Sequence, residues 1–121
     1  MIVRRAALAT LIVLVASPAL AADPNAPEQC ITGPIEKSYG GTPWLVVSCS
    51  DGKSLVFVAK EGSKAAPFEF DLTFTGSDYD LAGHGKGDRK LTAAAYADLQ
   101  KLTGKDVLAL LNATKAAKPK N

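Results

Sequence analysis

The chain has 121 residues, 47% of them hydrophobic and 21% charged, with 14 Lys and Arg against 12 Asp and Glu. Two of the basic residues, Arg4 and Arg5, lie in a predicted targeting segment, and subtracting them leaves 12 basic against 12 acidic residues. This balance gives no electrostatic reason to expect nucleic acid or an anionic membrane surface as a partner. About a hundred residues remain after that segment, which is enough for one domain with a single hydrophobic core.

Residues 1–22 have the features of a secretory signal peptide. Arg4 and Arg5 precede an apolar run at 6–16, and small residues in an Ala-x-Ala spacing follow it. Because this run is shorter than the ~20 residues that span a bilayer, the pattern predicts cleavage and export rather than a permanent membrane helix. We expect a periplasmic or secreted protein without stable membrane insertion, whose mature chain begins with a flexible leader at 23–28.

The first predicted strand covers 29–39. Its Gly33-Pro34 pair restricts it to a sheet edge or a bulged position, since proline cannot donate to a strand ladder. The segment carries Cys30, and the other cysteine of the chain is Cys49. In an oxidising compartment the two are expected to form a disulfide, which clamps the edge strand to the following hairpin and contributes about 3 kcal/mol.

A β-hairpin is predicted at 44–60, around the turn dipeptide Asp51-Gly52. A two-residue type I′ turn at that dipeptide pairs Val46 with Phe57 and fixes the rest of the register. Both faces of this strand pair are apolar. The hairpin is therefore predicted to lie inside a sheet that is covered on both faces, or inside a closed barrel.

The next predicted strand, at 68–75, has the clearest pattern in the chain. Apolar and polar residues alternate there with a period of two, as in a strand with one buried and one solvated face. A turn at Gly76-Ser77 then predicts a returning strand at 78–82, in which Leu81 lies opposite Leu72. Together these segments predict an antiparallel sheet of four or five strands.

The segment at 83–90 alternates glycine with charged residues and His84, and we predict a solvated glycine-rich turn here. One alternative is a ligand or anion site, in which successive backbone amides and basic side chains surround the bound group. Its residues would be Gly83, His84, Gly85, Lys86, Gly87, Arg89 and Lys90. A second alternative is a weak divalent-metal site that combines one imidazole with carboxylates, drawn from Asp78, Asp80, His84 and Asp88.

Helical periodicity follows this segment. Two apolar stripes with helical spacing lie on either side of a capping sequence. In that sequence Thr103 is the N-cap and Asp106 is the third helical residue. The two stripes are Leu91, Ala95, Leu99 and Leu102, then Val107, Leu110 and Leu111. They predict two short helices, or one helix kinked at Gly104, packed on the sheet. A single α+β domain is therefore expected at 29–114, followed by a basic flexible tail at 115–121.

Residue types that are typical of enzymes are sparse. His84 is the only histidine, both cysteines are expected in a disulfide, and no serine lies in a Gly-x-Ser-x-Gly elbow. Four acids on the predicted strands would suit general acid-base chemistry if burial raised the pKa of one of them, but they alternate with apolar positions and are expected to face water. They are Glu69, Asp71, Asp78 and Asp80. The sequence therefore predicts neither catalytic residues nor a cofactor.

The leading functional hypothesis is a small exported, non-enzymatic module that binds a protein of the cell envelope or the extracellular space. An inhibitor or an accessory subunit would act in this way. Tyr39 and Trp44, amphipathic aromatic residues beside a predicted turn, are the candidate contacts to that partner. The alternative function is a small-ligand, anion or divalent-ion binding domain that uses the glycine-rich segment around His84.

Overall fold

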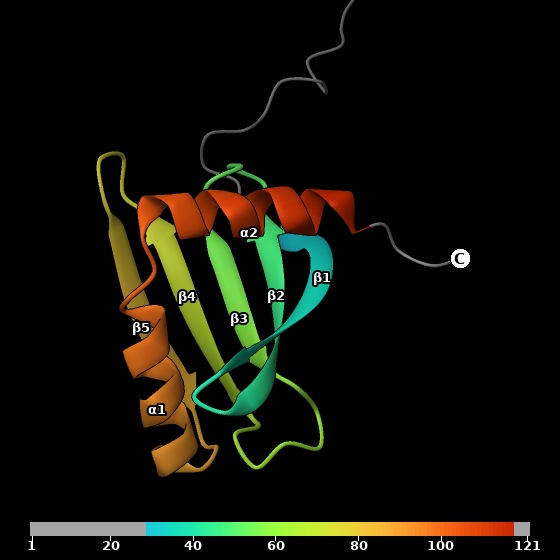
Figure 1. The fold of residues 1–121 in the computed structure, drawn as a ribbon, viewed down its shortest axis with the longest axis vertical. Coiled ribbons are helices and arrows are strands. Elements are labelled where there is room, and N and C mark those ends of the chain that lie inside the picture. Colours follow the sequence, from blue (N-terminus) through green and yellow to red (C-terminus); the bar gives the residue numbers. More distant parts are fainter. Residues whose placement is uncertain (1–28, 118–121) are drawn as a thin grey trace, which may run out of the picture.

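Five strands and two helices make up residues 29–117, the part of the chain that the structure, a computed structural model, describes (Figure 1). The elements are β1 (Cys30–Tyr39), β2 (Thr42–Cys49), β3 (Leu55–Ala59), β4 (Phe68–Phe74), β5 (Tyr79–Gly85), α1 (Arg89–Leu99) and α2 (Gly104–Ala116). Neighbouring strands are antiparallel, and their order in the sheet is β1-β2-β3-β4-β5, the same as in the sequence. The predicted α+β fold, with its antiparallel sheet and C-terminal helical pair, is confirmed.

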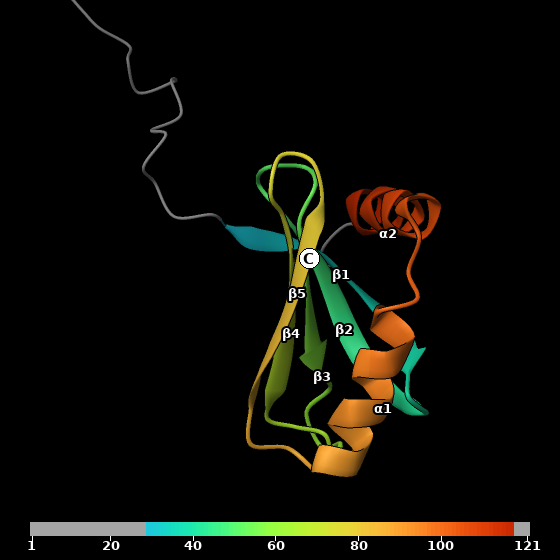
Figure 2. The same ribbon diagram turned by 90° about the vertical axis from the view of Figure 1, so that its left-hand side faces the viewer.

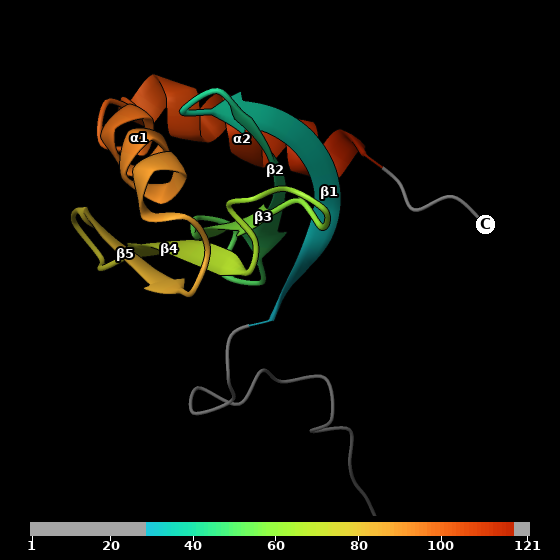
Figure 3. The ribbon, with the colours of Figure 1, turned by 90° about the horizontal axis from the view of Figure 1, so that it is seen from below.

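Both helices lie on the same side of the sheet (Figure 2), and β1 curves from the sheet toward α2 (Figure 3). The core between the two layers includes Trp44, Phe57 and Phe70 from the strands, together with Leu99 and Leu110 from the helices. Because successive strand residues point to opposite faces, the other side of the hairpin points away from the helices. The prediction that this sheet is covered on both faces is therefore wrong for the described residues, since the helices cover one face.

The β2–β3 hairpin has the predicted register throughout. Its turn differs from the predicted two-residue type I′ turn, because the Gly52 amide donates to the Cys49 carbonyl and the Lys53 amide donates to the Asp51 carboxylate. Cys49 and Ser54 thus close a longer loop, with a backbone hydrogen bond of 2.9 Å. The Asp51 side chain supplies the bonds that a backbone turn would otherwise make.

β1 is an edge strand with two irregularities, as Gly33-Pro34 predicts. Its register with β2 shifts between Cys30 and Thr32, and again between Thr32 and Ile35. Cys30 lies opposite Cys49 and is bonded to it, which confirms the predicted disulfide between the edge strand and the hairpin.

β5 has the predicted register with β4 but is longer than predicted, since it continues through His84 to Gly85. The glycines of this extension make room for aromatic rings of β4. A Cβ atom on Gly83 would lie 2.6 Å from the Phe70 ring, and one on Gly85 would lie 2.9 Å from the Phe68 ring. The prediction of a turn that begins at residue 83 is therefore wrong.

The helices are separate, and α2 begins with the predicted capping box between Thr103 and Asp106. α2 continues to Ala116 rather than ending at 114, so Lys115 belongs to its last turn and not to the tail. The predicted signal peptide, the leader at 23–28 and the tail from 118 onward lie outside the described residues. Neither described helix is long and apolar enough to span a bilayer.

Candidate functional site

The sheet face that the helices leave open has an apolar part and a charged part. Paired residues form two rows across β2 to β5. One row is Leu45, Val58, Glu69 and His84, and the next is Val47, Val56, Asp71 and Ala82. We call Leu45, Val47, Val56 and Val58 the apolar strip. We call Glu69, Asp71 and His84 the acid–histidine cluster.

The apolar strip is partly accessible to solvent. Val58 is 37% exposed, and a shallow depression of about 430 Å³ lies over Val47, Val56 and Val58. The Cys30–Cys49 disulfide lines the same depression at one side, and Glu69 and Asp71 line it at the other. The strip therefore adjoins the acid–histidine cluster without a gap.

The acid–histidine cluster brings an imidazole between two carboxylates. The His84 Nε2 atom lies 3.4 Å from an Asp71 carboxylate oxygen and 3.5 Å from a Glu69 carboxylate oxygen. Glu69 and Asp71 are two positions apart on β4 and so share a face, while His84 is the β5 residue opposite Glu69. Sheet pairing thus fixes the three backbone positions.

The pKa of Glu69 in this cluster is higher than that of a free glutamate side chain. A hydrogen bond with Asp71, then partial burial and the Asp71 charge, raise the pKa of Glu69, and the neighbouring His84 opposes this rise. The Asp71 Oδ1 atom is buried and has no hydrogen-bond partner. A buried carboxylate oxygen without a donor is costly.

Several backbone amides of the glycine-rich segment, which the anion hypothesis would use as donors, are already bonded within the protein. The Lys86 and Gly87 amides donate to the Pro67 carbonyl, and the Asp88 amide donates to the Lys64 carbonyl. The amides of Lys90 and Leu91, at the start of α1, donate to the Asp88 carboxylate. The backbone donors that the anion hypothesis needs are therefore occupied by the protein itself.

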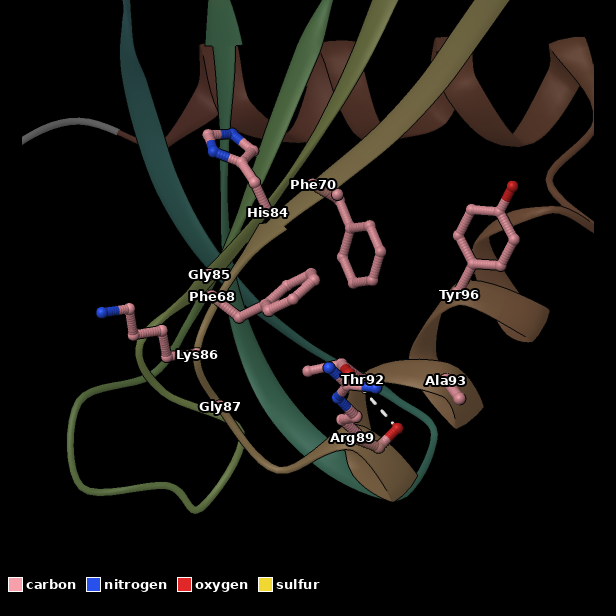
Figure 4. A pocket seen from close by; sticks show the side chains of 11 residues that line it. Phe68, Phe70, His84, Gly85, Lys86, Gly87, Arg89, Thr92, Ala93 and Tyr96 are labelled. Atoms are coloured by element: carbon pink, nitrogen blue, oxygen red, sulfur yellow. Dashed lines mark hydrogen bonds between the residues drawn. The ribbon is translucent and has the colours of Figure 1, made fainter.

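Six of the seven residues proposed for that site line an open groove of about 760 Å³ beside α1, and Lys90 does not (Figure 4). Phe68, Phe70 and Tyr96 form its aromatic wall. Figure 4 shows the His84 and Lys86 side chains pointing away from these rings. The groove therefore gathers aromatic surface, while the histidine belongs to the opposite face of the sheet.

The carboxylates proposed as metal ligands do not gather around His84. Asp88 caps α1, and Asp78 accepts a hydrogen bond from the Tyr79 amide. The sequence prediction missed Glu69 and Asp71 as neighbours of His84. The signal was present in the predicted register, because extending the β4–β5 pairing beyond residue 82 places His84 opposite Glu69.

The aromatic residues proposed as partner contacts are buried. Trp44 is 0% exposed and its indole N–H donates to the Thr42 hydroxyl, while Tyr39 is 8% exposed and packs edge-on against Phe57. Neither ring is accessible to a partner, so the prediction that Tyr39 and Trp44 contact a partner is wrong. The strip of aliphatic residues on the open face is the accessible apolar surface of the hairpin.

Comparisons of the chain with protein-family models, with curated proteins and with solved structures find no match.

Proposed function

We propose that this protein is a small exported, non-enzymatic module that binds another protein through the open face of its sheet. The observation that carries the proposal is the apolar strip, four aliphatic residues that lie side by side on a face that no described helix covers. Contiguous exposed apolar surface beside charged residues is a feature of protein interaction sites.

Charge on the open face indicates the chemistry of the partner. Glu69 and Asp71 border the strip on one side, and on the other side Glu36 is paired with Lys60 at 2.7 Å. The negative charge at Glu69 and Asp71, two carboxylates beside one imidazole, would be stabilised by Lys or Arg. The partner surface is therefore an apolar patch bordered by basic side chains.

The disulfide supports a location for this partner. A Cys30–Cys49 bond is compatible with the periplasm or the extracellular space, where disulfides persist. The partner would be a protein of the cell envelope or the extracellular space. The module would act on it as an inhibitor or as an accessory subunit.

A site-directed photo-crosslinking experiment tests the proposal. A photoreactive residue replaces Val58 on the open face, and a second variant carries it at Leu108, which is 57% exposed on α2. Exposure to the envelope fraction of the source cells should give one specific adduct from position 58 and none from 108. The adduct is identified by mass spectrometry, and binding is then measured with the purified partner.

Val58→Lys should weaken that binding at least about tenfold, since it removes apolar contact and repels a basic border. Leu108→Lys, a matched change on the helix layer, should leave the dissociation constant unchanged. Equal effects of both variants would contradict binding through the open face. A dimer in sedimentation that Val58→Lys abolishes would show that a second copy of this chain, rather than a different protein, binds the open face.

A further inference from the structure

The acid–histidine cluster has the ligand spacing of a metal site. Donor atoms bound at ~2.1 Å to one tetrahedral ion lie ~3.4 Å apart. The two contacts of the His84 Nε2 atom, at 3.4 and 3.5 Å, match this separation. All three ligand atoms lie within 4.8 Å of one another.

A second observation is independent of that spacing. The Asp71 side chain is 37% exposed as a whole, with its Oδ2 atom facing the His84 imidazole, whereas its Oδ1 atom is buried and has no hydrogen-bond partner. Buried charged oxygens are normally paired or bound to a metal. A cation held between the side chains would compensate the negative charge of this carboxylate and the repulsion between the two acids.

The backbone gives the cluster a rigid base. β4 lies between β3 and β5, so the positions of Glu69 and Asp71 are fixed by hydrogen bonding on both sides. The His84 side chain is 64% exposed, and its same-face neighbour on β5, Ala82, carries only a methyl group. An ion can therefore reach the cluster from solvent.

The donor set selects a class of metal. Ca²⁺ takes six to eight oxygen ligands, and Mg²⁺ prefers oxygen and water, whereas imidazole favours Zn²⁺ and its transition-metal neighbours. Three protein ligands with an open position are also the arrangement of zinc sites that keep a water or accept a further ligand.

We infer that Glu69, Asp71 and His84 form a surface site for one divalent ion of the zinc class, with a coordination position left for water or an incoming donor. This site uses His84, as the ion-binding alternative predicted from the sequence does, but with different carboxylates. It goes beyond the protein-binding proposal and shares Glu69 and Asp71 with it, but metal binding is measured on the protein alone, so the two proposals are tested separately.

The test uses tag-free, oxidised full-length chain stripped of metal, and Zn²⁺ as the probe. Calorimetric titration should give one ion per chain. Since His84 is the only histidine, its imidazole resonances report binding without overlap, and they should shift or broaden in step with the calorimetric isotherm. Mg²⁺ at the same concentration should leave these resonances in place.

Three variants test the ligands individually: His84→Gln, Asp71→Asn and Glu69→Gln. Each should weaken Zn²⁺ binding at least about tenfold, because even residues that only support metal ligands contribute 10- to 100-fold. The control is Asp80→Asn, which removes an exposed acid from the same strand outside the cluster and should not change the affinity. Far-ultraviolet circular dichroism checks that each variant folds.

Three results would overturn the inference. One is Zn²⁺ binding that leaves the His84 resonances of the unmodified chain unchanged, a readout that needs no variant. Another is an Asp80→Asn variant that loses as much affinity as Asp71→Asn, which would show diffuse binding of the ion to surface acids. Failure to bind Zn²⁺ at all would equally refute the site, while leaving the protein-binding proposal as it stands.

Discussion

The hydroxyl oxygens of Thr114 in α2 and Ser48 in β2 lie 2.7 Å apart in the core, where they join the helix layer to the sheet. Thr114 Oγ1 also lies 2.8 Å from the Leu111 carbonyl oxygen. A hydroxyl has one proton, so Thr114 donates to the carbonyl and accepts from Ser48. This arrangement satisfies both buried hydroxyls.

A double-mutant cycle tests this pair. Thr114→Val removes the acceptor and leaves the buried Ser48 hydroxyl unpaired, which should cost about 1 to 3 kcal/mol of unfolding free energy. Ser48→Ala should cost about 1 kcal/mol. The double variant should cost less than the sum, because no buried hydroxyl then lacks a partner. Denaturant unfolding measures all three, and additive costs would contradict the proposed bond.

Gly40 and Gly41, at the turn between β1 and β2, provide a matched pair. Both have positive φ angles, 60° and 80°, but a Cβ atom on Gly40 would lie 2.4 Å from the Ala95 backbone nitrogen, and one on Gly41 would meet nothing within 4 Å. Gly41→Ala should cost about 1 kcal/mol through backbone strain. Gly40→Ala should cost about 1 to 3 kcal/mol more, because α1 must move away. Equal midpoints in urea would contradict this close packing.

The stability of the protein should depend on Tyr39 at alkaline pH. Burial, followed by the charges of Asp106 and Asp98, raises the pKa of Tyr39 to about 12 from 10.0. A raised pKa means that the folded state resists loss of the phenol proton. The contribution of Tyr39 is therefore complete below pH 10 and declines by about 2 to 3 kcal/mol as pH rises through 12.

The comparison with Tyr39→Phe isolates this effect, since lysines and the other tyrosines titrate equally in both proteins. The stability difference between the two should change between pH 10 and 12. Tyrosinate absorbance gives the pKa directly. If the three tyrosines ionise together at the normal value, burial of Tyr39 does not have the electrostatic consequence described here.

Reduction of the disulfide should loosen β1. Cys30 and Cys49 are 19 residues apart, a loop for which chain entropy gives about 3 kcal/mol. With reductant, amide exchange should accelerate first in β1, because it is an edge strand with two register shifts. The Cys30→Ser/Cys49→Ser variant should show the amide exchange of the reduced protein, and reductant should not change that exchange. Unchanged β1 exchange on reduction would show that the bond does not anchor this edge.

Local patterns in the sequence were sufficient to predict much of the fold. The alternation at 68–75, the capping box at Thr103 and the spacing around Asp51-Gly52 are read from neighbouring residues, and each specifies a face, a helix start or a register. The turn at Asp51 differs in detail because its side chain replaces backbone hydrogen bonds, yet the register is the same.

The glycines of β5 were misinterpreted because glycine usually marks a turn. Here Gly83 and Gly85 lie in a strand, and the reason lies in another strand, where the rings of Phe70 and Phe68 occupy the space of their missing side chains. That contact is between residues far apart in sequence. It also determines the candidate site, because the extra strand length brings His84 to Glu69.

By itself, the sequence determined the strands, the helices, the disulfide partners and the alternation of faces, since propensity, periodicity and capping act over a few residues. The tertiary structure alone decided which face of the hairpin is buried. Trp44 and Leu45 begin rows of comparable hydrophobicity, and only packing of α1 and α2 over the first row leaves the second accessible. The same choice placed Glu69, Asp71 and His84 together on the open face, where the buried Asp71 Oδ1 atom has no hydrogen-bond partner.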